Sequence, residues 1–240
     1  MKKEIYQVMF ENQDDCWIFR GWSKVMDSLI KQNIYNKENK ILDVGCGTGS
    51  NLKLLSKYGS VYGVDASEHA IKYASSLNIA ELKQGGIESL PYDDNSFDMV
   101  FCIEVIYHDW VKNKDKALSE LYRVLKKDGI LVIREPAYNW LRSHHDTLFE
   151  SSQRFTKDKL SKKMDKVGFG IIKKTYANTF LFPLALIKRV FERKVYSAEE
   201  MFPKGFLFDM FYYVFVLEAK LLKFISFPFG LSVICIGKKE

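Results

Sequence analysis

The stretch that most constrains the fold is KILDVGCGTGSNLKLL, residues 40–55, in which three glycines follow a short apolar run. The run KILDV has the composition of a buried parallel strand. Leucines then recur at roughly helical spacing over residues 49–58. Gly45, Gly47 and Gly49 therefore fall at a strand-to-helix turn, where glycine permits positive φ and lets a ligand approach the backbone.

Strand and helix patterns continue to alternate beyond this turn, which predicts a parallel, doubly wound α/β sheet with helices on both faces. Ser67 and Asp115 are the expected helix N-caps. Further strands are expected over 60–65, 80–85, 97–103, 130–135, 170–180 and 231–237, and helices over 67–77, 115–129 and 155–169.

The 240 residues suit a single domain with a sizeable core, and no repeat or linker divides them. We expect N-terminal helices in residues 1–38 and a ligand-binding core in 39–178. A mostly helical insertion is expected over 179–228, before a last strand in 229–240.

Asp65 ends the second expected strand on the same sheet edge as the glycine turn. Ligands of open α/β sheets bind at the carboxyl ends of the strands, and a carboxylate there can accept both ribose hydroxyls. The ligand should therefore contain adenosine. The dinucleotide fingerprint GxGxxG is not met, because Ser50 stands where its third glycine or alanine would be.

The pattern LDVGCGTG resembles motif I of the class I S-adenosylmethionine (SAM)-dependent methyltransferases. VYGVDASEHAIKYA, GGIESLPYDDNSFDMVFCIEVIYH and ALSELYRVLKKDGILVIREP resemble the later motifs in order, so that the resemblance covers residues 40–136. It implies a Rossmann-like, seven-stranded sheet whose last strand is antiparallel, and SAM as the cofactor.

The resemblance also implies cofactor-binding roles. For Ile87, Cys102 and Ile103, the alternative to a cofactor contact is plain packing in the core. Glu88 is considered as a contact to the adenine amine, because Gly86 stands where the family often has an acidic residue. The implied set has the glycine loop (Gly45, Cys46, Gly47, Gly49) facing the methionine moiety, Asp43 supporting that loop, Asp65 on the ribose, Ala66 and Ile87 near the adenine, and Cys102 and Ile103 beside the sulfonium.

The segment MFENQDDCWIFRGWSKVMDSLI, residues 9–30, resembles the leading helix of relatives in which this helix covers the cofactor. Trp17 and Arg20 match that pattern, whereas Cys16 replaces a histidine. The alternative is an amphipathic helix that packs on the sheet.

Four residues after the fourth and fifth strands are candidates for acid–base chemistry, since a hydroxyl or ammonium acceptor must lose a proton. His108 ends CIEVIYH and could act near the transferred methyl group or cap its loop. His145 and Asp146, in the loop EPAYNWLRSHHD, could serve as base and orienter or hold the loop shut. Tyr138 is a further pocket candidate.

Residues 179–228 are rich in Phe, Leu and Tyr, with no uninterrupted run as long as a membrane span. They either cap the active site or present Phe-rich faces to a lipid or membrane surface, aided by Lys188, Arg189, Arg193 and Lys194. A net charge of +6 permits an anionic substrate or a membrane face.

The remaining patterns limit the partners. The four cysteines form no CxxC and no metal spacing, so that we expect no metal and a reducing cytoplasm. Basic residues are dispersed, and no nucleic-acid partner is expected. The sequence thus predicts methyl transfer to an O or N centre of a small-molecule, sugar or lipid-linked acceptor. The alternatives are a nicotinamide-dependent oxidoreductase and a non-catalytic binding module.

Overall fold

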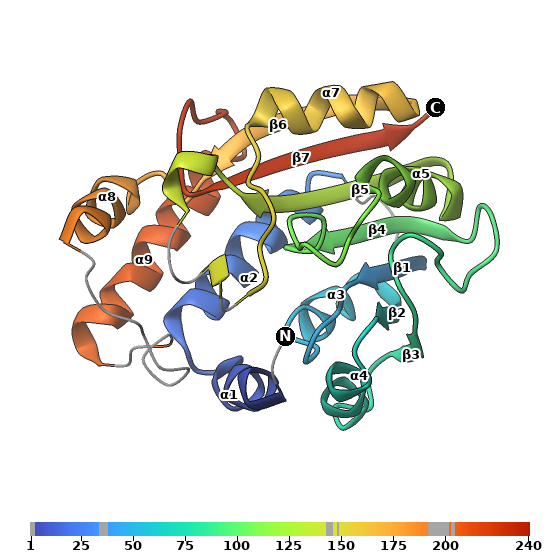
Figure 1. The fold of residues 1–240 in the computed structure, drawn as a ribbon, viewed down its shortest axis with the longest axis horizontal. Helices are drawn as coiled ribbons and strands as arrows, with labels where there is room; N and C mark the ends of the chain where they lie inside the picture. The colour runs from blue at the N-terminus through green and yellow to red at the C-terminus, as the bar shows by residue number, and fades with distance from the viewer. Residues whose placement is uncertain (1–2, 34–37, 143–145, 148, 192–201, 203–204) are drawn as a thin grey trace.

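The computed structural model describes residues 3–33, 38–142, 146–147, 149–191, 202 and 205–240, and its centre is one seven-stranded sheet (Figure 1). The strand order is β3-β2-β1-β4-β5-β7-β6, and β7 alone runs antiparallel to its neighbours β5 and β6. The predicted Rossmann-like α/β sheet is confirmed. The strands are β1 (Asn39–Val44), β2 (Gly59–Asp65), β3 (Glu81–Gln84), β4 (Phe97–Ile103), β5 (Leu125–Pro136), β6 (Phe169–Ala177) and β7 (Ser232–Lys239).

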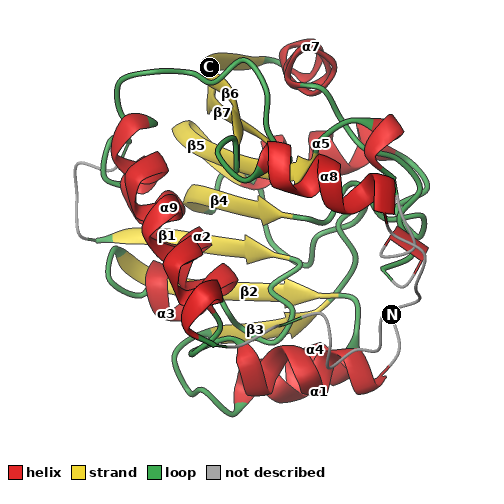
Figure 2. Cartoon of the chain, turned by 90° about the vertical axis from the view of Figure 1, so that its left-hand side faces the viewer, coloured by secondary structure: helices red, strands yellow, loops and turns green. Residues whose placement is uncertain are grey.

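Helices cover both faces of this sheet (Figure 2). On one face, α2 and α9 lie side by side, and on the other α5 packs against α7. α1 packs against α4 near the β3 edge. The described helices are α1 (Lys3–Asn12), α2 (Trp17–Ile30), α3 (Leu52–Leu55), α4 (Glu68–Ser75), α5 (Lys114–Val124), α7 (Lys157–Val167), α8 (Phe182–Phe191) and α9 (Phe206–Leu221), with a 3-10 turn, η1 (Asn139–Leu141).

The central strands β1 and β4 and the stretch 131–135 of β5 are mostly buried, as near-continuous apolar sequences in a two-sided sheet require. The helix ends follow from local chemistry. The Ser67 side chain accepts a hydrogen bond from the Ala70 N–H, which confirms the predicted cap of α4. Thr156 caps α7 in the same way, and Gly168 ends that helix at φ +111°.

Two predicted boundaries around α5 are wrong. The N-cap is Asn113, whose side chain accepts from the Lys116 N–H, rather than Asp115. The helix ends at Val124, and β5 begins at Leu125 instead of at Ile130. Leu125 pairs with Phe97 before the register shifts, so that the turn-forming residues 126–129 fall within the strand. The leucines after Gly49 form only the short α3.

The insertion between β6 and β7 is mostly helical in its described part, as predicted, and is anchored by a buried acid. Glu218 on α9 is 1% exposed and accepts hydrogen bonds from the backbone N–H groups of Asn178, Thr179 and Phe180. α9 also approaches α2 closely, because a Cβ at Gly21 would lie 2.5 Å from the Phe215 ring. The insertion therefore braces the N-terminal helix.

Candidate active site

The glycine loop after β1 contains two glycines that are needed for different reasons. Gly45 has φ +71°, and a Cβ there would lie 2.3 Å from a methyl carbon of Val105. Gly47 has φ +54°, but a Cβ there would meet nothing within 4 Å. Gly45 thus permits close packing between two loops, whereas Gly47 leaves open space over the backbone, which is what close approach of a ligand requires.

Asp65 ends β2 beside this loop. One carboxylate oxygen accepts from the Gly47 N–H at 2.9 Å and the other from the Ser67 N–H at 2.8 Å. Burial raises the pKa of this carboxyl, while the two N–H groups favour its charge. Each oxygen keeps acceptor capacity, so the pair can also receive two ribose hydroxyls.

Asp43 lies beneath the glycine loop and is completely buried. Neither carboxylate oxygen has a hydrogen-bond partner among the residues that the structure describes. Burial, together with the charge of Asp65, raises the pKa of Asp43 to about 8. An orphaned carboxylate at this depth fits a loop that binds a cationic ligand, because a positive charge above it would offset its cost.

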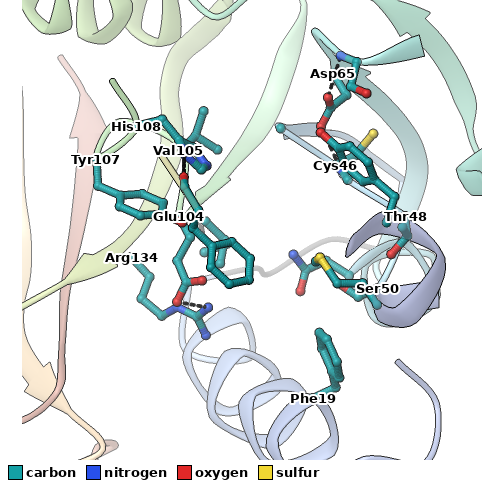
Figure 3. A pocket seen from close by; sticks show the side chains of 18 of the residues that line it. Phe19, Cys46, Thr48, Ser50, Asp65, Glu104, Val105, Tyr107, His108 and Arg134 are labelled. Carbon is teal, nitrogen blue, oxygen red and sulfur yellow. Dashed lines mark hydrogen bonds and ion pairs between the residues drawn. The ribbon is translucent and has the colours of Figure 1, made fainter. Parts of the chain in front are cut away.

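The loop and Asp65 form one wall of a cavity of about 550 Å³ (Figure 3). Figure 3 shows Glu104, Tyr107 and His108 on the opposite wall and Phe19 on a third side. Nonpolar and aromatic side chains of the N-terminal helices complete the enclosure: Tyr6 and Met9 from α1, and Ile18, Phe19 and Trp22 from α2.

Glu104 follows β4 and holds an unusual backbone conformation, with φ +58°. Its carboxylate receives a hydrogen bond from the Arg134 guanidinium at 2.8 Å. Arg134 is 6% exposed and lies 3.8 Å over the Trp22 ring. This ion pair and cation–π contact hold a carboxylate at the cavity wall and join β5 to α2.

Glu135 fixes the loop that carries the other polar residues of this wall. It is completely buried and accepts hydrogen bonds from the backbone N–H groups of Val105, Ile106 and Tyr107. Burial raises the pKa of Glu135 to about 8. These hydrogen bonds fix the backbone up to Tyr107, so that the next residue, His108, is held at a rigid sheet edge.

His108 lies on the cavity wall, and its ring Nδ1 is 2.7 Å from the carbonyl oxygen of Phe149. The ring also stacks on Trp110, with centroids 5.0 Å apart. Burial lowers the pKa of His108, so that the imidazole is neutral near pH 7. A neutral imidazole that donates from Nδ1 presents Nε2 as a proton acceptor.

The structure brings many of the predicted cofactor residues together and leaves others away from the cavity. Those that line it, with the candidate base, are Gly45, Cys46, Gly47, Asp65, Ala66, Ile103 and His108. Asp43, Gly49, Ile87, Glu88, Cys102, Trp17 and Arg20 do not line it.

Each cofactor candidate outside the cavity has a structural setting of its own. Ile87 and Cys102 are buried in the core, and Glu88 accepts from the Asn113 N–H at the start of α5. Trp17 packs on aromatic rings of α9, and Arg20 lies over the Tyr212 ring. For Ile87 and Cys102 this is the core packing considered as the alternative.

Of the predicted catalytic residues in the loop after β5, Tyr138 and Asp146 do not line the cavity. Tyr138 stacks on Tyr176 at 5.0 Å, away from the cavity lining. Asp146 forms a buried, two-pronged ion pair with Arg154, with both N–O distances 2.8 Å. His145, like His144, lies outside the described residues. The geometry therefore favours the loop-holding interpretation of Asp146.

Several residues at the cavity carry no sequence signal that singles them out. Arg134 sits within a strand pattern, and Trp22 reads as one apolar residue of an amphipathic helix. Gln13 and Thr48 are both buried and hydrogen-bonded at 2.9 Å, which ties the α1–α2 junction to the glycine loop. These pairs join segments far apart in the chain, so spacing alone could not find them.

Within the described part of the chain, no group of three or more His, Cys, Asp or Glu side chains is arranged to hold a metal ion. The helices described there are also all too short or too polar to cross a membrane.

This sheet order, with a glycine loop after β1 and a carboxylate at the end of β2, defines a nucleoside-binding α/β enzyme fold. Comparison with known proteins gives the family. Residues 42–133 match the family described as "Methyltransferase domain". The ubiquinone/menaquinone biosynthesis C-methyltransferase UbiE of Campylobacter jejuni is 30% identical over 244 residues, which cover 94% of this chain and 87% of that protein.

An uncharacterized methyltransferase of Bacillus subtilis, YcgJ, is 35% identical over 108 residues, 42% of each chain, so that this chain spans less than half the length of that relative. Among solved structures, a chain from the complex of the Haloferax volcanii Trm112 methyltransferase activator with a methyltransferase has a TM-score of 0.64. That match has 17% identity and covers 99% of this chain and 98% of the other, which shows the shared fold. The chain belongs to the class I SAM-dependent methyltransferases, and its cofactor is SAM.

Proposed function

We propose that the chain transfers the methyl group of SAM to an O, N or C centre of an acceptor with an apolar or aromatic part. The observation that carries this proposal is the single cavity of about 550 Å³ that joins the Gly47–Asp65 wall to the wall of Glu104 and His108. The acceptors expected from the sequence are a small molecule, a sugar or a lipid-linked compound that is methylated at O or N. We add carbon centres because the relative UbiE is named as a C-methyltransferase.

The residues present fit SAM. The open space over Gly47 admits the ligand, and the free acceptor capacity of Asp65 suits the ribose. A cationic cofactor above the loop would favour the ionised form of Asp43. Bound SAM would supply a methyl group activated by its sulfonium.

The protein mainly positions the acceptor for in-line attack and excludes water. The rings of Phe19, Trp22 and Tyr107 supply apolar walls for that acceptor. The neutral imidazole of His108 would take a proton from a hydroxyl or ammonium nucleophile. Glu104, held by Arg134, would orient a polar group of the acceptor or share the proton.

Exposed apolar side chains near the insertion support a lipid-linked acceptor within this proposal. Leu184 and Ile187 on α8 are 50% and 57% exposed, and Trp140, which contacts Phe182 of α8, is 65% exposed. Such a surface suits peripheral contact with lipid. The cationic residues expected to assist, Lys188, Arg189, Arg193 and Lys194, have side chains outside the described part.

The test begins with Asp65→Ala and the milder Asp65→Asn, compared with wild type for binding of S-adenosylhomocysteine by calorimetry. Loss of two hydrogen bonds to a carboxylate, at about 1.5 kcal/mol or more each, predicts affinity about 100-fold weaker for Asp65→Ala. Wild-type affinity in Asp65→Ala would contradict the assignment of the ribose site.

The acceptor is then sought by incubating wild type and Asp65→Ala with methyl-labelled SAM and extract of the source cells. Asp65-dependent label in the organic phase supports a lipid-linked acceptor, and label in the aqueous phase supports a soluble one. Cofactor binding without label, across fractionated extracts, would favour the non-catalytic binding module.

A further inference from the structure

A second hollow, of about 360 Å³, opens beside the catalytic cavity and has a different character. The two share the wall residues Phe19, Ser23 and Ser50, so that a molecule could occupy both. We call this hollow the basic cleft. Its volume lies within the range of small-molecule sites.

Four cationic side chains line the basic cleft: Arg20 and Lys24 from α2, Lys53 from α3, and Lys57. Among the described residues of the lining, Asp14 is the one acidic side chain, and it pairs with Lys53 through both oxygens, at 2.7 and 2.5 Å. The lining thus keeps a formal excess of three positive charges. A concave surface with one sign of charge focuses its field on an anion.

The remaining cations are available to a ligand. The guanidinium carbon of Arg20 lies 4.5 Å from the centre of the Tyr212 ring, and this cation–π contact positions the side chain. In the part of the chain that the structure describes, Arg20, Lys24 and Lys57 form no side-chain hydrogen bond or ion pair. Gathering these like charges is unfavourable, and an anion that enters the cleft would relieve their repulsion.

We propose that the basic cleft binds a phosphate or diphosphate group of the methyl acceptor while its reactive end reaches the catalytic cavity. This deepens the proposed function and rests on it. Arg20 offers a planar fork of N–H donors and the lysines offer point charges, which together suit phosphate oxygens. The role predicted for Arg20 thereby moves from the cofactor to the acceptor. A phosphate on a lipid carrier and a phosphate on a soluble molecule share this chemistry.

The cleft is tested on the full chain with S-adenosylhomocysteine bound, using inorganic diphosphate as the probe in calorimetry. The variant Lys24→Ala/Lys57→Ala removes two exposed cations of the cleft. The control Lys116→Ala/Lys127→Ala removes two exposed cations associated with α5 and β5, and changes the net charge equally. We expect the cleft variant to bind diphosphate at least about tenfold more weakly and the control to match wild type.

Affinity for S-adenosylhomocysteine is measured in the same proteins and should not change. If wild type does not bind S-adenosylhomocysteine, the proposed function is overturned. If wild type binds it, and the cleft and control variants bind both diphosphate and the anionic vesicles described below equally well, only the cleft is overturned. The single variant Lys24→Gln, with a milder expected loss, keeps the test open if the double variant fails to fold.

Sedimentation with phosphatidylcholine vesicles containing phosphatidylglycerol separates the two sources of phosphate. Cleft-dependent binding of diphosphate alone indicates a soluble phosphate ligand, and cleft-dependent binding of vesicles indicates a lipid one. Cleft-dependent binding of neither probe, or of an oligonucleotide but not diphosphate, would overturn the proposal.

Discussion

The buried carboxyl of Asp43 makes the stability of the cofactor-free protein depend on pH in a way that one substitution should remove. In the folded chain the pKa of Asp43 is raised from 3.8 to about 8. A group with a raised folded pKa contributes its stability below the unfolded pKa and loses it as pH rises through the folded pKa. The contribution of Asp43 to the stability of wild type should therefore be lost progressively between about pH 4 and pH 8.

The magnitude follows from the shift. One pKa unit corresponds to about 1.4 kcal/mol, so ionisation of the unfolded chain disfavours folding by about 2 kcal/mol at pH 5 and about 5 kcal/mol at pH 8. Asp43→Asn keeps the shape of the side chain and does not titrate. The free energy of unfolding of Asp43→Asn minus that of wild type should thus increase by about 3 kcal/mol as the pH rises from 5 to 8.

The assay is urea unfolding of the cofactor-free proteins from pH 5 to pH 8, followed by tryptophan fluorescence and circular dichroism. Asp93→Asn, at an exposed position, is the control and should track wild type at each pH. A difference between Asp43→Asn and wild type that stays constant with pH would refute the assignment of a raised pKa to Asp43.

Three further outcomes are expected. Gly45→Ala should lower the free energy of unfolding by about 3 kcal/mol, because it adds a clash with Val105 to positive-φ strain, whereas Gly47→Ala should cost about 1 kcal/mol but abolish S-adenosylhomocysteine binding in calorimetry. His108→Gln should lower kcat about 100-fold or more on a proton-bearing acceptor, and the wild-type rate should fall as pH drops through the lowered pKa of His108; unchanged kcat would exclude it as the base. Glu218→Ala should lower the free energy of unfolding by about 3 kcal/mol or more in urea titrations, because three backbone N–H groups lose their acceptor, with Glu218→Gln intermediate.

The cofactor half of the fold could be predicted because its signals are local. The strand KILDV, the glycine turn and Asp65 lie within a short stretch, and parallel strands bring their carboxyl ends to one edge. The cap at Ser67 follows from chemistry within one helical turn. The boundary at Leu125 failed because its residues suit a helix, and only pairing with Phe97 makes them strand.

The acceptor half could not be predicted, because its key contacts join distant segments. Arg134 reaches both Glu104, just after the neighbouring strand β4, and Trp22 on α2, and no spacing in the sequence relates these three. Tyr138 and Asp146 share a loop at the correct sheet edge, but their side chains are taken by Tyr176 and Arg154. Position at an edge narrows the candidates, and the partner of each side chain then decides which of them can reach a ligand.

Glu218 has a structural role that the sequence does not reveal. In the sequence it interrupts a long apolar run, which makes α9 unsuited to spanning a membrane. In the fold the same carboxylate accepts hydrogen bonds from backbone N–H groups just after β6, such as that of Thr179. The next residue of α9, Ala219, accepts a hydrogen bond at its carbonyl from the Ser28 hydroxyl on α2. α9 is therefore fixed to both the sheet edge and the helix that carries Phe19 and Arg20. Phe19 lines both the cavity and the basic cleft, and Arg20 lines the basic cleft, so the insertion helps to set the shape of the proposed acceptor side.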